Sequence, residues 1–387
     1  MRFWPLGGAP SAVPAPLTHT PCRDDSFGTI FGRWVGSEPQ LPAVGTGSHT
    51  DAIPLSGRFD GVLGVLGGIQ AVASLRRAGF SPKRSIDVIM FNSEEPTRFG
   101  LSCSGSRAMA GALTAARLAT LKDSLSNLTF AQVAAAAGFG GAQGEQAMLD
   151  AARLKPDAYS AFVELHIEQG PRLERAGIPI GVVTAIAAPA ALTVDFYGEG
   201  GHAGALLMAD RHDAGLAAAE LALVVEQAAL GTGAEDTVGT AGMVTLLPGA
   251  VNSVPRHAHM ELDIRDIDGP RRDAVVQRIL DGAAEIADRR GVRLETAFIN
   301  SDPPASSAPH VVDAIAAAAT TLGLDHMRMV SRAYHDSLFV AQVVPSAMVF
   351  IPCAGGFSHR PDEFASDADM ERGVGVLALT LAQLTMQ

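Results

Sequence analysis

Three short apolar segments of this chain each end beside a histidine or an acidic pair. They have the length and composition of buried strands: residues 42–48 lead to His49, residues 85–91 to Glu94 and Glu95, and residues 161–165 to His166. Residues 61–78, between the first two, have the length and composition of a buried helix, which predicts a βαβ unit and a mostly parallel sheet. The carboxyl ends of such strands meet at one edge of the sheet, where open α/β proteins bind ligands.

The pattern changes near residue 189. The segments that follow have the order βαββαβ: strand 192–197, helix 214–230, strands 237–246 and 257–266, helix 270–290 and strand 292–299. This order is typical of a ferredoxin-like α+β domain, in which an antiparallel sheet carries two helices on one face. Helix 311–322, strand 346–351 and helix 367–384 then return to α/β character.

We therefore expect a mixed, mostly parallel α/β metal-binding domain with an inserted α+β lid. The predicted metal-binding domain comprises residues 1–188 and 304–387, and the predicted lid comprises residues 189–303. Residues 1–21 match no regular element and are expected to be irregular.

Bulk composition favours a small-molecule partner. A chain of 387 residues exceeds what one hydrophobic core usually organises, so two domains are expected. The formal net charge of −12 argues against binding to nucleic acid or to an anionic membrane. Apolar runs are too short to span a bilayer, and three cysteines without CxxC spacing indicate no disulfide framework.

Five separate motifs carry metal-binding chemistry: GSHTD at 47–51, RFDG at 58–61, SEEP at 93–96, ELHIE at 164–168 and SHRP at 358–361. Together they offer three imidazoles and several carboxylates, enough for two divalent ions that share one carboxylate. The predicted ligands are His49, Asp60, Glu95, His166 and His359. Asp60 lies on a glycine-flanked turn and is the predicted bridging carboxylate.

Two further acidic residues of these motifs suit catalysis. Glu94 cannot easily bind the same ion as its neighbour Glu95, so we predict that it is the general base. It would take a proton from the attacking water and return it to the departing amine. Asp51 lies two residues after His49 on the same side of an extended segment, and we predict that it fixes the tautomer of that imidazole. Each residue alone has a structural alternative, and the prediction rests on the motifs occurring together.

The chain resembles the dinuclear-metal amidohydrolases of the carbamoylase and allantoate amidohydrolase group, within the aminoacylase and carboxypeptidase superfamily. The motifs that carry this resemblance are HIEQG at 166–170, GGHAGA at 200–205, PGAVNSVP at 248–255 and LDIRDID at 262–268. Four further stretches are more similar to the ureidoglycolate amidohydrolase branch of plants and algae: SEEPTRFGLSC at 93–103, GVVTAIAAPA at 181–190, SRAYHDSLF at 331–339 and FIPCAGGFSH at 350–359. Tyr334 stands where carbamoylases tend to have glycine, and ALL at 205–207 where they tend to have a threonine-threonine-proline run.

The resemblance implies the same five metal ligands and the same general base, Glu94. It also implies that His202, from the lid of a partner subunit, stabilises the oxyanion. Finally, it implies that Gln169, Asn252 and Arg265 bind the substrate. A guanidinium is suited to bidentate capture of a carboxylate, and an imidazole can meet developing negative charge.

Three of these polar residues keep alternative interpretations. Arg265 could instead form an ion pair at the strand edge with Asp263 or Asp266. Tyr334 and His335 are substrate-binding candidates, but a packing role fits them as well.

The resemblance implies hydrolysis of (S)-ureidoglycolate to glyoxylate, ammonia and carbon dioxide, by a homodimer joined through its lid. It implies two manganese ions, although imidazole and carboxylate ligands also accept zinc, cobalt or nickel. The alternatives are hydrolysis of an N-carbamoyl-L-amino acid or of allantoate, and a catalytically silent binding protein of the same fold. Plant relatives are directed to the endoplasmic reticulum by residues that would precede the segment of this chain that matches them. We expect the same location if this protein carries such a signal, and a cytoplasmic location if it does not.

Overall fold

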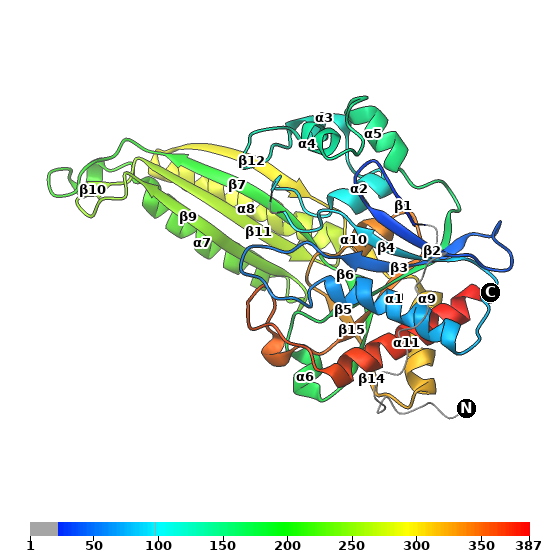
Figure 1. The fold of residues 1–387 in the computed structure, drawn as a ribbon. Helices are drawn as coiled ribbons and strands as arrows, with labels where there is room; N and C mark the ends of the chain where they lie inside the picture. Colours follow the sequence, from blue (N-terminus) through cyan, green and yellow to red (C-terminus); the bar gives the residue numbers. More distant parts are fainter. Residues whose placement is uncertain (1–21, 97) are drawn as a thin grey trace.

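The computed structural model describes residues 22–96 and 98–387, which form a large α/β part and a long lid (Figure 1). Residues 1–21, expected to be irregular, lie outside the described residues. The large part is built on a sheet with the strand order β1-β2-β4-β3-β5-β15-β6-β13, and β14 also pairs with β6. These strands are Cys22–Asp24 (β1), Ile30–Trp34 (β2), Ala43–His49 (β3), Ile86–Phe91 (β4), Tyr159–Ile167 (β5), Ile180–Ile186 (β6), Ala305–Ser306 (β13), His326–Ser331 (β14) and Ser346–Ile351 (β15).

The centre of this sheet is parallel. β4, β3, β5 and β15 run in the same direction, so their carboxyl ends lie at the same edge. β2 and β13 pair antiparallel with their neighbours, and β6 pairs antiparallel with β15. Every residue of β3 is buried, and so is almost every residue of β5, which explains why these strands have continuous apolar runs rather than an alternating pattern.

Helices cover both faces of the large sheet. On one face, α1 (Val62–Arg77), α9 (Pro309–Thr321) and α11 (Asp367–Thr385) lie together and share a hydrophobic core with β3, β5 and β15 (Figure 1). On the other face, α2 (Ser104–Ala110) packs beside α10 (Asp336–Val340). The remaining helical elements of this part are α3 (Ala115–Thr120), α4 (Phe130–Ala136), α5 (Glu145–Ala152), α6 (Arg172–Ala176) and η2 (Ala354–Gly356).

The lid is a four-stranded antiparallel sheet with the order β12-β7-β11-β9. Its main elements are β7 (Ala188–Tyr197), α7 (Ala214–Leu230), β9 (Val238–Leu247), β11 (His257–Asp266), α8 (Gly269–Arg290) and β12 (Arg293–Ser301). Buried and partly exposed residues alternate along β11, because the two helices cover only one face of the sheet. A small ribbon of β8 (Gly201–His202) and β10 (Ser253–Val254), followed by η1 (Met208–Asp210), forms the end of the lid that is farthest from the large sheet (Figure 1).

The predicted fold class is confirmed: a mostly parallel sheet is interrupted by a separate antiparallel α+β lid. The exact domain limits, residues 189 and 303, stay a prediction. The chain leaves the large sheet after Ile186 and returns to it at Ala305. The sequence analysis did not predict the strands β1, β2, β6, β13 and β14; of these, β1 and β13 are only three and two residues long. Among the described residues, no helix combines the length and apolar composition that a membrane span requires.

Candidate metal centre

Side chains that follow three neighbouring parallel strands meet at one edge of the large sheet. His49 is the last residue of β3, and His166 is the last residue but one of β5. Glu94 and Glu95 follow β4 after a short turn, and Asp60 comes from the turn that precedes α1. Since β3 lies between β4 and β5, the sheet itself brings these residues together from distant parts of the chain.

Asp60 lies between two groups of ligand atoms. Its Oδ1 is 3.4 Å from Nε2 of His49 and 3.1 Å from Nε2 of His166. Its Oδ2 is 3.0 Å from Nε2 of His359, and that nitrogen is 3.4 Å from Oε1 of Glu95. Within each group the ligand atoms lie within 4.8 Å of one another. The structure therefore brings the five predicted ligands together and places Asp60 in both groups.

The arrangement of these residues fits a divalent cation. Oε1 of Glu95 is buried and has no hydrogen-bond partner, as expected of an oxygen that faces a cation. Nδ1 of His49 lies 3.0 Å from the carbonyl oxygen of Asp51, which leaves Nε2 free to face Asp60. Gly61 has a φ of 67°, and a Cβ there would lie 2.4 Å from Nε2 of His49, so glycine keeps the space beside this ligand open. Imidazole and carboxylate ligands bind several divalent metals.

The three imidazoles and the acidic groups shift one another's pKa values strongly. Burial alone would raise the pKa of Asp60, but hydrogen bonds with His166, His359 and His49 hold it below its usual range. Burial opposes protonation of His49, but the charges of Glu94 and Asp60 raise the pKa of its imidazole well above the ordinary value.

The pKa of Glu95, the glutamate among the predicted ligands, is shifted as well. Burial, with added repulsion from the charge of Glu94, raises the pKa of Glu95 to about 7. Metal ligands bind in their deprotonated forms, so a cation at this site would displace the proton.

Glu94 lies beside the cluster but belongs to neither ligand group. Its Oε1 accepts a hydrogen bond of 3.2 Å from the thiol of Cys103, and its Oε2 lies 3.7 Å from Nε2 of His49. Burial raises the pKa of Glu94. Oε1 is thus fixed by the thiol of Cys103 while Oε2 faces the ligands, an arrangement that suits a general base. Sequence analysis missed Cys103, because a lone cysteine gives no signal for such a contact.

The predicted role of Asp51 needs a correction. Its carboxylate is 3.8 Å from Nδ1 of His49, farther than its own carbonyl oxygen, which makes the contact that orients the ring. The carboxylate accepts hydrogen bonds from the backbone amides of Glu95 at 3.0 Å and Glu94 at 3.4 Å. β3 ends at His49, and beyond it the side chain of Asp51 orients the backbone of the acidic pair instead.

Gln169 is the predicted substrate-binding residue that lies at the cluster. Its Nε2 donates to Oδ2 of Asp60 at 2.8 Å and to Oγ of Ser358 at 3.1 Å. Its Oε1 is buried without a hydrogen-bond partner. That acceptor is free to meet a donor on a bound molecule.

His202 and Asn252 lie together at the far end of the lid. His202 is on β8 and is exposed, and the backbone amide of the next residue, Ala203, donates to the carbonyl oxygen of Asn252 at 2.9 Å. Figure 1 places this ribbon at the opposite end of the lid from the strand ends that carry the ligands. Within one chain, therefore, neither residue meets the metal cluster.

Arg265 adopts the alternative that the sequence left open. On β11, its guanidinium donates to the carboxylate of Asp263 at 2.8 Å and to the carbonyl oxygen of Arg332 at 3.0 Å. The carbonyl contact joins the lid to the large part of the chain. The structure does not bring Arg265 to the ligand cluster.

Tyr334 and His335 have mainly packing roles in this structure. The hydroxyl of Tyr334 donates to Asp302 and accepts from Arg107 at 3.1 Å. His335 is buried behind His166, with ring centroids 4.6 Å apart, and its Nε2 is 2.9 Å from Oγ of a serine on β14. Burial lowers the pKa of His335 well below the ordinary value. His335 is buried beside Phe350, whereas Tyr334 is only partly buried, against the apolar residues around α10.

Residues 45–383 match the sequence profile of Peptidase family M20/M25/M40. The chain belongs to this family. The ureidoglycolate hydrolase of Oryza sativa subsp. japonica is 56% identical over 368 residues, which cover 94% of this chain and 75% of that relative. The ureidoglycolate hydrolase of Arabidopsis thaliana is 55% identical over 367 residues, with 94% of this chain and 76% of the relative covered.

A solved structure supports the same grouping. The crystal structure of AtUAH in complex with glyoxylate superposes with a TM-score of 0.85 at 54% identity, and the match covers 95% of this chain and 86% of that chain. The resemblance inferred from the sequence motifs is therefore confirmed.

Proposed function

We propose that this protein hydrolyses (S)-ureidoglycolate to glyoxylate, ammonia and carbon dioxide, in the breakdown of purine-derived ureides. The observation that carries the proposal is 56% identity, over 94% of the chain, to a ureidoglycolate hydrolase. The cluster supports it, because the five predicted ligands and Glu94 all lie together. Hydrolysis of a carbon–nitrogen bond is one of the reactions that such a cluster can catalyse.

The cofactor in this proposal is a pair of divalent cations. His49 and His166 would hold one, Glu95 and His359 the other, and Asp60 would bridge them. When bound, the cations would polarise the ureido carbonyl and make the attacking water more acidic. We propose manganese, and zinc, cobalt or nickel remain alternatives that the ligand set also accepts.

Proton transfer in the proposed reaction falls to Glu94. Its Oε2 faces the ligands and would take a proton from the water as the carbon–oxygen bond forms. The same oxygen would then return the proton to the nitrogen as the carbon–nitrogen bond breaks. Cys103 holds the other oxygen, so Glu94 keeps one orientation through both steps.

We also propose that the active form is a homodimer in which each lid tip serves the other chain. His202 then stabilises the oxyanion in the partner's site, near Gln169, and Asn252 assists in substrate binding there. Arg265 lies at the base of the lid and would bind the substrate carboxylate in place of Asp263.

Two features of the lid support the proposed dimer. His202 is exposed and lies far from the cluster of its own chain (Figure 1). β9 is an edge strand with exposed apolar side chains, such as Val244 at 48% exposure, and such an edge readily pairs with a second chain.

One assay separates the proposed substrate from its rivals. Purified, manganese-loaded protein is given (S)-ureidoglycolate, allantoate and an N-carbamoyl-L-amino acid in parallel, and the release of ammonia and glyoxylate is measured. Preference for ureidoglycolate supports the proposal. Preference for either other substrate contradicts the substrate assignment. Inactivity with all three, in protein that binds metal, favours a silent binding protein.

The location in the cell stays an expectation from the sequence resemblance. We propose the endoplasmic reticulum if a targeting segment precedes the matching region in the cell, and the cytoplasm otherwise. Imaging of the natural gene product fused to a fluorescent protein at its C-terminus tests this.

A further inference from the structure

A buried carboxylate that is not itself a predicted ligand joins two ligand-bearing turns. Oε1 of Glu363 accepts hydrogen bonds from the backbone amides of Phe59 at 2.9 Å and Asp60 at 3.1 Å. Its Oε2 accepts a hydrogen bond of 2.8 Å from the hydroxyl of Ser358, the residue that precedes His359. Glu363 therefore contacts the turn of the bridging carboxylate and the turn of the last imidazole at once.

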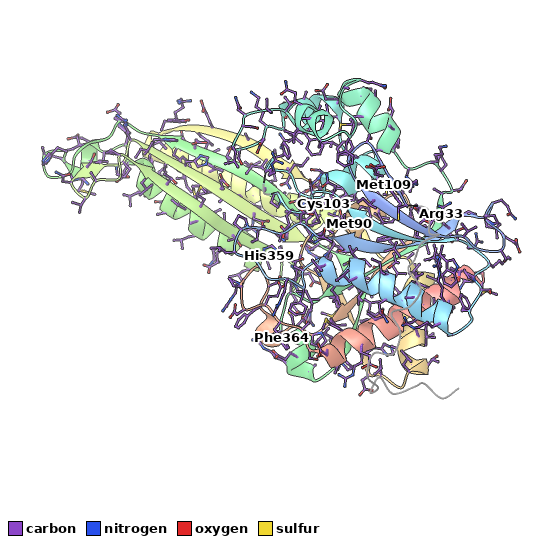
Figure 2. All side chains as sticks on the ribbon, in the orientation of Figure 1. Arg33, Met90, Cys103, Met109, His359 and Phe364 are labelled. Atoms are coloured by element: carbon purple, nitrogen blue, oxygen red, sulfur yellow. The ribbon has the colours of Figure 1, made fainter. Side chains whose placement is uncertain are left out.

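The turn of His359 is held mainly through Ser358, whose hydroxyl also accepts a hydrogen bond of 3.1 Å from Nε2 of Gln169. The imidazole is 46% exposed and lies where the large part meets the base of the lid (Figure 2). His359 also has a φ of 58°, a backbone conformation that a residue with a side chain adopts only when its surroundings hold it there. Ser358 is tied to Glu363, and the ring of Phe364 packs edge-on against the ring of Phe59 at 5.9 Å. These contacts hold this turn against the turn that precedes α1.

The environment of Glu363 suits a negative charge that faces cations. The side chain is only 3% exposed, and no arginine, lysine or histidine forms an ion pair with it among the residues that the structure describes. Two amides and one hydroxyl satisfy its oxygens. A buried carboxylate without a cationic partner is costly, and cations bound at Asp60 would offset that cost.

Gly57 makes room for this carboxylate. A Cβ at Gly57 would lie 2.2 Å from Oε1 of Glu363 and 2.4 Å from its Cβ. Both distances are shorter than any normal contact. Alanine at this position would therefore expel the carboxylate from the amides of Phe59 and Asp60 without altering Glu363 itself.

We propose that Glu363 is a positioning residue for metal binding: it locks the Asp60 turn to the His359 turn and so sets the geometry of the site that these two ligands share with Glu95. Gly57 is part of the same proposal, because a side chain at this position would occupy the space of the carboxylate. The inference rests on the proposed metal site and is independent of which substrate the protein hydrolyses.

The test measures Mn²⁺ binding to metal-stripped protein by isothermal titration calorimetry. Contacts that orient metal ligands are typically worth about 10–100-fold in affinity, so Glu363→Ala and Gly57→Ala should each weaken Mn²⁺ binding by at least about tenfold. The double variant should be no weaker than Glu363→Ala, because both changes remove the same contact. Glu363→Gln keeps an acceptor for the two amides but loses the negative charge, so its Mn²⁺ affinity should lie between those of Glu363→Ala and the wild type.

Asp362→Ala is the matched control. Asp362 is the neighbour of Glu363, but its carboxylate is exposed and pairs with Arg360 at 2.7 Å, so this variant should bind Mn²⁺ like the wild type. Thermal unfolding of the metal-free proteins checks that each variant folds. If Glu363→Ala does not fold, the Mn²⁺ affinities of Gly57→Ala and Glu363→Gln test the inference in its place.

Three results would overturn the inference: wild-type affinity in Glu363→Ala, fully additive losses in the double variant, or no Mn²⁺ binding by the wild type. Weaker Mn²⁺ binding in a protein that does not hydrolyse ureidoglycolate would support the inference while removing the proposed substrate.

Discussion

The ligand cluster and the lid tip differ in how completely one chain builds them. At the cluster, His49, Asp60 and His166 are buried, and each is held by contacts from other parts of the same chain. At the lid tip, His202 is exposed, and its imidazole accepts a hydrogen bond from the amide of Gly204, two residues along the chain. The first region is ready to bind metal by itself. The second carries His202, which contacts no metal ligand of its own chain. We therefore infer that it serves another chain.

The largest effect on kcat should follow removal of the general base at the ligand cluster. Glu94→Gln should lower kcat by about 10³-fold, because general acid–base catalysis contributes factors of about 10²–10⁴. The metal content should not change, since Glu94 belongs to neither ligand group. Steady-state kinetics and metal analysis of the same preparation check both parts. A variant that loses its metal along with its activity would make Glu94 a ligand and not a base.

A smaller but still large effect should follow a change at the lid tip. His202→Ala should lower kcat by about 10²-fold, the usual loss when one oxyanion donor is removed, and should leave Mn²⁺ affinity unchanged. His259→Ala is the matched control. His259 lies on the same lid, but it hydrogen-bonds to Asp195 at 2.9 Å within the sheet, so its removal should leave kcat unaltered. Equal kinetics of His202→Ala and wild type would contradict a role for the lid tip.

A third effect is the pH dependence of metal binding at the ligand cluster. The pKa of Glu95 is raised to about 7 without metal, so this group holds a proton below that pH and releases it when a cation binds. Mn²⁺ affinity should therefore rise between pH 6 and pH 8, by up to about tenfold per pH unit for each proton that the cation displaces. Calorimetric titrations at pH 6, 7 and 8 measure this. An affinity that is the same at pH 6 and pH 8 would contradict the role of Glu95 as a ligand.

The smallest effect is expected where the lid joins the large part of the chain. Tyr334→Phe removes a hydroxyl that links Asp302 to Arg107, but Arg107 keeps both its hydrogen bonds to Asp302, at 2.6 and 2.7 Å. We expect a loss of about 1 kcal/mol in the free energy of unfolding, the usual value for one hydrogen bond, with little change in kcat. Urea denaturation measures the first and the ammonia assay the second. A large loss of kcat, or altered preference among the three substrates, would restore Tyr334 as a substrate contact.

The sequence predicts the cluster well because short segments of the chain already show where each strand ends and which ligand lies there. Each of β3 and β5 is an apolar run that ends in a histidine, and parallel pairing then brings the two ends together without any knowledge of side-chain contacts. The same holds for the order of elements in the lid, where the predicted helix and strand limits at 214–230 and 257–266 agree with the structure.

Contacts between distant residues were not predictable in this way. Glu363 reaches the amides of Phe59 and Asp60 across some three hundred residues, and backbone amides carry no sequence signal. Arg265 shows a different limit. Its residue type is equally suited to a substrate carboxylate and to Asp263, and only the structure shows that Asp263 is its partner.

The central claim, that one chain builds the metal cluster and its partner completes the site, is tested most directly by mixed dimers. Glu94→Gln and His202→Ala chains with different affinity tags are coexpressed, and the doubly tagged dimer is purified. In that dimer the His202→Ala chain keeps its own Glu94 and receives His202 from its partner, so one of its two sites is complete. We predict that each variant alone is nearly inactive and that the mixed dimer recovers about half of the wild-type kcat per dimer. A mixed dimer no more active than its parents, or a wild-type protein that is fully active as a monomer, would contradict the claim.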